Sequence, residues 1–210
     1  MRKRGKLTMS ATLTSTEREP VVLRFSPILR QMSEHEFYEF CQLNRDLRLE
    51  LTSEGDLIIM PPTGGKTGIR NSRLNLRLAG WTEKDGTGQA FDSSTVFTLP
   101  NGAKRSPDFS WVGNERWEAL SDEEQEQFPP LCPDFAVELR SRTDTLKNLR
   151  HKMEEYMANG AQLGWLIDPQ ERRVYVYRPG AAVEGLDDPR AVPGEPLLRG
   201  LELELQEIWD

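Results

Sequence analysis

The chain has 210 residues, of which 37% are hydrophobic and 29% charged, and this balance is typical of a soluble globular protein that buries a core without disulfides or a structural metal. The net charge of −7 counts against a protein that coats nucleic acid through an extended basic surface, although a local basic groove can coexist with an acidic remainder. No apolar run approaches the roughly 18 residues needed to span a bilayer, so no membrane contact is predicted.

The N-terminal segment, residues 1–26, is polar, with clusters of Thr and Ser and no apolar periodicity, which predicts a flexible tail. Its basic first residues are not followed by an apolar signal segment, so a cytoplasmic location is expected. Residues 27–210 are expected to form one domain, which includes a loop and a short end segment at the C-terminus.

The first half of this domain contains signals for two helices and a pair of strands. Ser33 and Glu36 have the Ser-x-x-Glu spacing of a capping box, which begins the first helix. Apolar residues then recur at alternating or helical spacing, between turn signals. The elements expected here are a helix over 33–44, strands over 47–51 and 56–60, and a helix over 67–82.

The second half alternates short strands with helices, and Gly160 is well placed to end the longer helix. The strands are expected over 88–92, 95–99, 107–112, 135–139, 163–167 and 173–177. The helices are expected over 114–120 and 146–159, with loops over the rest of 113–133 and over 179–196, and an edge strand or short helix over 201–208. This irregular order predicts an α/β protein with a mixed sheet flanked by helices.

Three of the predicted strands carry a carboxylate opposite a row of apolar side chains. Because side chains alternate along a strand, Asp108 lies on the opposite face from Phe109, Glu138 lies opposite Val137, and Glu50 repeats the pattern. Each acid taken alone is equally consistent with a solvent-facing sheet, but an ionised group in a half-buried strand is costly unless it is paired or binds a metal. Acids of neighbouring strands, which lie about 4.8 Å apart, can meet at one hard cation such as Mg²⁺.

Asp134 is a rival to Asp108, because Pro133-Asp134 is a second Pro-Asp pair. Four residues along one strand separate Asp134 from Glu138, which puts their Cα atoms roughly 13 Å apart, too far for one ion to bridge easily. Asp108 is expected on a different strand, so it can lie beside Glu138. We therefore expect Asp134 to begin its strand rather than to share the site.

A cation is available on the helix after Glu138. Lys152 lies at the edge of the apolar face formed by Leu149, Met153 and Tyr156, from which its ammonium can reach over the sheet towards the carboxylates. The alternative is an ordinary lysine whose stem packs on the edge of the core and whose head lies in water. The pattern alone leaves both interpretations open.

In their order and spacing these residues resemble the PD-(D/E)XK nuclease superfamily, and more closely its Uma-two-type putative restriction endonuclease family. The resemblance runs from about Met32 to Pro179, with a weaker match over 201–209. The matching stretches are Arg48–Glu50 with Ile59–Gly64, Ser106–Asp108, Pro133–Ser141, and Lys152–Tyr156 with Gly160 and Trp165–Pro169.

The resemblance implies a restriction-endonuclease-like α/β/α core with a central mixed β-sheet flanked by helices. It implies metal ligation by Asp108 and Glu138, with Mg²⁺ or Mn²⁺ as the cofactor, and an acid role for Glu50. The activity that follows is phosphodiester hydrolysis, with DNA as the expected nucleic-acid partner. Whether one or two ions bind is left open.

The chain departs from the superfamily motif at the lysine expected two residues after the second acid, where Arg140 stands. The resemblance to this branch places that lysine on the following helix, where Lys152 matches the motif spacing. Lys147 is a second candidate, but it lies on a different helix face. Arg140 stays protonated near neutral pH, so it suits a phosphate clamp that binds substrate better than a proton acceptor.

The roles of the acid and the lysine remain alternatives. Glu50 is expected to hold the ion through a water or to orient the nucleophile. Lys152 is expected to orient the attacking water or to stabilise negative charge, and acting as a base would require a depressed pKa.

Two other functions compete with a metal-dependent endonuclease. A catalytically silent nuclease-fold binding or assembly module would lack a ligand, whereas Asp108, Glu138 and Lys152 are all present. A glycosidase that uses Asp108 and Glu138 as an acid pair would need no metal and would carry an aromatic sugar platform.

Two further patterns bear on partners. A row of arginines at helical spacing could meet phosphates or form a solvated face: Arg70, Arg73 and Arg77. Many nucleases that cut both strands are symmetric dimers, and three leucines alternating with Glu could supply the interface of a homodimer: Leu201, Leu203 and Leu205.

Overall fold

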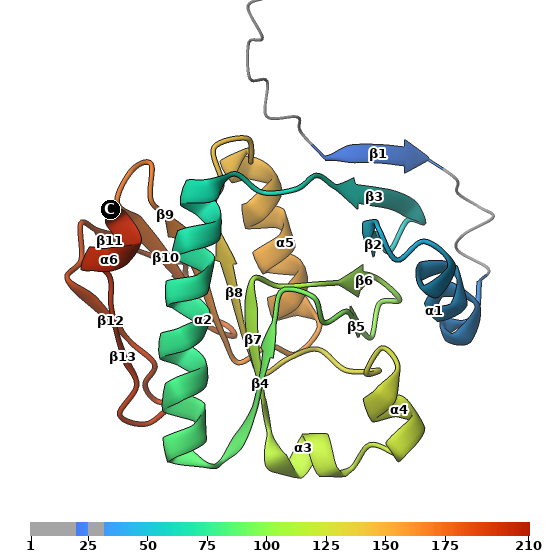
Figure 1. Ribbon diagram of the computed structural model, residues 1–210. Coiled ribbons are helices and arrows are strands. Elements are labelled where there is room, and N and C mark those ends of the chain that lie inside the picture. Colours follow the sequence, from blue (N-terminus) through green and yellow to red (C-terminus); the bar gives the residue numbers. More distant parts are fainter. Residues whose placement is uncertain (1–19, 25–31) are drawn as a thin grey trace, which may run out of the picture.

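The computed structural model describes residues 20–24 and 32–210, and its largest feature is a central six-stranded sheet (Figure 1). The strand order is β11-β10-β9-β8-β7-β4. Strands β8 and β9 are parallel and the other neighbours are antiparallel, so the sheet is mixed, as predicted. Its strands are β4 (Gly88–Asp92), β7 (Phe109–Gly113), β8 (Phe135–Leu139), β9 (Leu163–Asp168), β10 (Arg173–Tyr177) and β11 (Glu184–Asp187).

Two long helices cover opposite faces of this sheet and complete the predicted α/β/α core: α2 (Gly65–Asp85) and α5 (Leu146–Ala158) (Figure 1). Strand β8 shows how the alternation of side chains divides the core. Phe135, Val137 and Leu139 pack in the cluster that includes Leu74 and Leu78 of α2, whereas Ala136 packs in the cluster of α5. Glu138 is therefore directed to the α5 side.

A second sheet, antiparallel and five-stranded, has the order β1-β3-β2-β6-β5 (Figure 1). Its strands are β1 (Val21–Arg24), β2 (Arg48–Leu51), β3 (Asp56–Met60), β5 (Phe97–Thr98) and β6 (Lys104–Arg105). The helix α1 (Glu34–Leu43), which begins at the predicted capping box, packs Phe37 against Leu49, Leu51 and Leu57 of this sheet. The sequence predicted β2, β3 and α1, but not that they belong to a separate sheet.

Several elements differ from the sequence prediction. Strand β1 lies in the expected tail, of which residues 1–19, 25 and 26 lie outside the described part of the chain. The helix over 67–82 is longer, because it begins after Gly64 and ends at Gly86, whose φ of +69° glycine adopts without strain. Unpredicted or shortened elements are β5, β6, α3 (Asn114–Glu118), α4 (Asp122–Glu126), β11 and β12 (Ala191–Pro193).

The C-terminal segment folds back against α2 (Figure 1), and it includes both elements considered for 201–208: β13 (Glu202–Glu204), paired with β12, and α6 (Gln206–Trp209). The three alternating leucines are at most 5% exposed and belong to the chain's own core. They are therefore not free to form an interface, and the homodimer stays a prediction without this support.

The arginine row of α2 contacts this C-terminal segment, and Arg77 is also exposed to solvent. Arg70 donates to the carbonyl oxygen of Trp209, and Arg73 donates to that of Glu207. Arg77 pairs with the Glu207 carboxylate at 2.6 Å. These contacts hold the C-terminal segment against α2.

Within the described residues, no helix combines the length and the apolar character needed to cross a membrane. The cytoplasmic location stays a prediction.

Candidate active site

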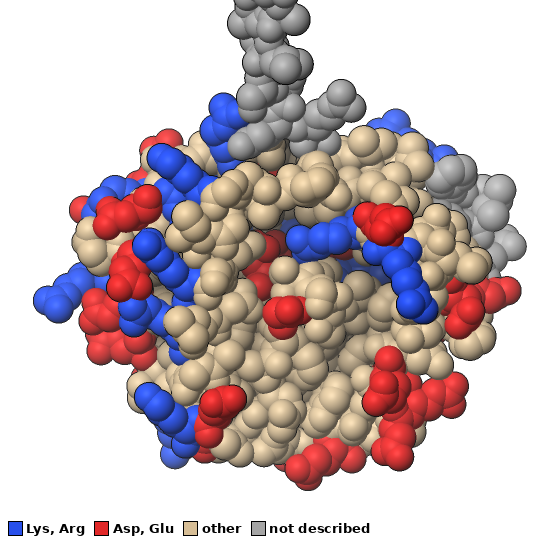
Figure 2. All heavy atoms as spheres, in the orientation of Figure 1, with Lys and Arg blue, Asp and Glu red and all other residues tan. Residues whose placement is uncertain are grey.

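A cavity of about 600 Å³ lies among the first turns of α2, the strands β2 and β3, the end of β8 and the helix α5. It is therefore lined by both sheets. In Figure 2, a hollow in this region of the molecule shows acidic side chains beside basic ones. The four predicted catalytic residues all line the cavity: Glu50, Asp108, Glu138 and Lys152.

Asp108 is the residue directly before β7, and it is half-buried. The register that pairs Phe109 with Val137 brings Asp108 opposite Glu138 on the neighbouring strand. Its Oδ1 accepts a hydrogen bond from the Asn71 side chain at 3.2 Å, and its Oδ2 accepts one from the Leu139 N–H at 2.8 Å. Burial raises the pKa of Asp108 despite these hydrogen bonds.

Glu138 lies near the end of β8 and is 4% exposed. Its Oε1 accepts a hydrogen bond from the Tyr156 hydroxyl at 3.0 Å and lies 2.9 Å from the Lys152 Nζ. Burial, with Asp108 and Glu50 adding to it and Lys152 opposing it, raises the pKa of Glu138 to about 7. Burial thus disfavours the ionised form of the Glu138 carboxylate unless a cation lies nearby.

Lys152 extends from α5 into the acid cluster, and its side chain is only 12% exposed. Its Nζ donates to the Glu50 Oε1 at 2.7 Å and also contacts Glu138. The alternative of a head group in water is therefore wrong. Burial lowers the pKa of Lys152, but Glu138 and Glu50 outweigh it and raise the pKa above its usual value. These contacts favour the charged ammonium and do not provide the depressed pKa that a role as base would require.

Glu50 reaches the cavity from β2, in the second sheet, and is 3% exposed. Besides Lys152, it accepts a hydrogen bond from the Ser106 N–H at 3.0 Å and pairs with Arg105 at 3.3 Å. Burial alone would raise the pKa of Glu50, but Lys152 and Arg105 together lower it. Glu50 is thus an ionised carboxylate already occupied by two cations.

Arg105 is a cavity residue that the sequence analysis missed. Its Nε lies 2.5 Å from the Glu155 Oε2, so the guanidinium joins Glu155 to Glu50. It lies in β6, which has two residues, and so short a strand shows no alternation that could assign its side chain to a face. Only its position three residues before Asp108 could have drawn attention to it.

Arg140 does not join the acids and does not line the cavity. Its guanidinium donates to the Asp168 Oδ2 at 2.7 Å and to the Asp144 carbonyl oxygen at 3.2 Å. Lys147 is exposed and also lies outside the cavity wall. Asp134 pairs with Arg116 and accepts the Gly113 N–H, which agrees with its expected place at the start of a strand.

The Arg140–Asp168 pair leads to a stability prediction, because the Asp168 side chain is 0% exposed. Arg140→Ala is expected to lower the free energy of unfolding by about 3 kcal/mol, since it leaves a buried carboxylate without its cation. Urea unfolding measures this loss. The double variant Arg140→Ala/Asp168→Asn should regain part of the lost free energy of unfolding. A loss under about 0.5 kcal/mol in Arg140→Ala alone would show that solvent can replace the ion pair.

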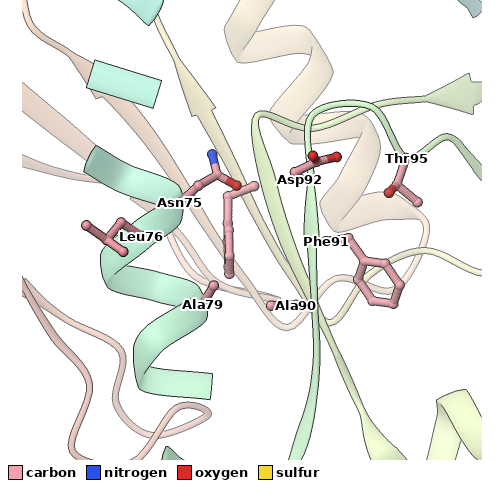
Figure 3. A pocket seen from close by; sticks show the side chains of 8 residues that line it. Asn75, Leu76, Ala79, Ala90, Phe91, Asp92 and Thr95 are labelled. Carbon is pink, nitrogen blue, oxygen red and sulfur yellow. The ribbon is translucent and has the colours of Figure 1, made fainter. Parts of the chain in front are cut away.

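A second hollow, of about 500 Å³, lies between α2 and β4 (Figure 3). Asn75, Leu76 and Ala79 line it from the helix, and Ala90 and Asp92 line it from the strand. It has one carboxylate and no cationic side chain in its wall. It therefore lacks the groups that acid, base or metal chemistry requires.

Asp108 and Glu138 provide carboxylate oxygens, the donors that a divalent hard cation prefers. Among the described residues, no three His, Cys, Asp or Glu side chains are grouped as a ready-made metal centre. Mg²⁺ needs fewer, because it usually takes one or two carboxylates and keeps several waters. Both acids line one cavity, and no described residue donates a hydrogen bond to Oε2 of Glu138. The pair fits a hydrated hard cation.

Comparison with known proteins identifies the fold and the family. A solved structure described as a "putative nuclease belonging to DUF820" from Anabaena variabilis matches with a TM-score of 0.69 and 23% sequence identity, over 85% of this chain and 97% of that chain. At this identity the match establishes the shared fold. No curated protein matches the sequence significantly. The family model Uma2, described as "Putative restriction endonuclease", matches residues 35–206. The chain therefore belongs to the Uma2 family of restriction-endonuclease-like proteins.

Proposed function

We propose that the protein is a metal-dependent endonuclease that hydrolyses phosphodiester bonds in DNA. The observation that carries the proposal is the meeting of Asp108, Glu138 and a fixed Lys152 cation in one cavity. Membership of a nuclease family supports it. A glycosidase is disfavoured by that membership.

The proposed roles follow from the contacts. Asp108 and Glu138 would hold Mg²⁺ or Mn²⁺. When bound there, the ion would supply an activated water and offset charge on the phosphoryl oxygens. Lys152, held at 2.7 Å from Glu50, would orient the attacking water or stabilise negative charge on the phosphate. Glu50 would act by holding Lys152 in place, because its oxygens are already engaged by Lys152, Arg105 and Ser106.

The test is a cleavage assay on single- and double-stranded DNA and RNA. Metal-free protein is expected to be inactive, and added Mg²⁺ or Mn²⁺ is expected to restore cleavage of DNA. Asp108→Ala, purified in the same way, controls for a contaminating nuclease. Cleavage that persists in excess chelator would contradict metal dependence. A protein that binds nucleic acid and never cuts, with metal bound, would be the silent binding module.

A further inference from the structure

Arg48 lies at the wall of the same cavity and has no role in the scheme above. It lies in β2 two residues before Glu50, so the alternation of the strand places both side chains on one face. Unlike Glu50, Arg48 is exposed. The cavity therefore has a guanidinium at its solvent side and the acids at its buried side.

The Arg48 guanidinium is linked through the Ser93 carbonyl oxygen to Ser106, in the segment that precedes Asp108. Its Nη2 donates to the Ser93 carbonyl oxygen at 2.7 Å, and the Ser106 hydroxyl donates to the same oxygen at 2.6 Å. Ser106 lies two residues before Asp108. Burial raises the pKa of Asp108, and the positive charge of Arg48 is among the influences that oppose the rise. Arg48 and Asp108 line the same cavity.

The other lysine and arginine side chains that line the cavity, and Arg140 outside it, are already paired with carboxylates. Lys152 contacts two carboxylates, Arg105 contacts two, and Arg140 is bound to Asp168. Among the described residues, Arg48 has no carboxylate partner, and its one hydrogen bond is to the Ser93 carbonyl. A guanidinium has five N–H donors, so Arg48 retains both charge and donors for a ligand.

We propose that Arg48 binds a phosphate of the nucleic-acid substrate at the mouth of the cavity, in the role that the sequence assigned to Arg140. The inference rests on the proposed function, since it names a substrate contact of the same site. The guanidinium of Arg48 is planar, and two of its N–H groups can donate to two oxygens of one phosphate at the same time. Such a contact positions the backbone without reading the base sequence.

The experiment measures binding of a labelled oligonucleotide, single- or double-stranded, by fluorescence anisotropy in chelator at about 50 to 200 mM salt. Arg48→Ala is expected to bind roughly ten-fold more weakly. The slope of log affinity against log salt should fall by about 0.9 for duplex DNA or about 0.7 for single strands. Arg48→Lys should keep the slope and lose part of the affinity, because it keeps the charge but not the fork.

The matched control is Arg45→Ala. Arg45 is also exposed and also donates to a backbone carbonyl, that of Gln42, but it does not line the cavity. It should match the wild type.

Two outcomes would overturn the inference while the proposed function stands. In one, Arg48→Ala binds with the affinity and slope of Arg45→Ala. In the other, it loses affinity with an unchanged slope, which would mean that only the Ser93 contact matters. A wild-type protein that binds but never cuts would remove the proposed cleavage and leave the Arg48 contact standing. A wild type that does neither would remove both.

Discussion

Asp108→Asn and Glu138→Gln are each expected to lower the single-turnover cleavage rate by about 10³-fold or more, because charge stabilisation by a bound metal is worth several kcal/mol. Both changes should leave the fold intact. An asparagine at 108 can still accept the Leu139 N–H, and a glutamine at 138 can still accept the Tyr156 hydroxyl. The measurements are single-turnover rates with saturating metal, calorimetric metal binding and urea unfolding.

The control for this pair is Asp134→Asn, which changes a carboxylate outside the cavity that pairs with Arg116 instead. Its cleavage rate should stay near the wild-type value. If Asp108→Asn and Glu138→Gln both cut normally with metal still bound, neither acid is a ligand.

Lys152→Ala is expected to lower the cleavage rate by about 10²- to 10³-fold, the usual cost of removing one donor that stabilises developing charge. Metal binding should survive, because Asp108 and Glu138 remain. Lys147→Ala is the matched control on the same helix, and its exposed side chain outside the cavity predicts a wild-type rate.

The Lys152 change also removes a cation from two buried carboxylates, so a loss of stability must be separated from a loss of chemistry. Lys152→Met keeps the packing of the stem, and rates are compared well below the unfolding temperature of each variant. A Lys152→Met protein that is folded, binds metal and cuts at the wild-type rate would reduce Lys152 to a structural partner of Glu50.

The alternation of β8 put Glu138 on the face opposite its apolar row, because the strand is long enough to show the pattern. The helical spacing of α5 put Lys152 at the edge of the apolar face, but it left open whether the ammonium reaches the acids or the solvent. Asp108 was expected beside Glu138 because the sequence predicted it on a different strand of the same sheet. The phosphate-clamp role of Arg140 stays a prediction; its side chain does not line the cavity, because β8 ends at Leu139. Beyond that point the alternation no longer decides the direction of a side chain, and the buried Asp168 at the end of β9 binds the guanidinium instead.

The parts of the site contributed by the second sheet could not be derived from the sequence. The contacts of Glu50 with Arg105 and Lys152 join residues separated by 55 and 102 positions. They depend on how the second sheet lies against α5, which no local pattern encodes. Arg105 and Arg48 became site residues only through that packing.

The bridge from Glu50 through Lys152 to Glu138 joins a residue of one sheet to a residue of the other. If Lys152 has its proposed role, its ammonium reaches the position needed for catalysis only after both sheets have packed together. Nuclease activity would then appear late in the folding of the chain. A folding intermediate with only one sheet formed would contain Asp108 and Glu138, but Lys152 would not yet bridge Glu50 and Glu138.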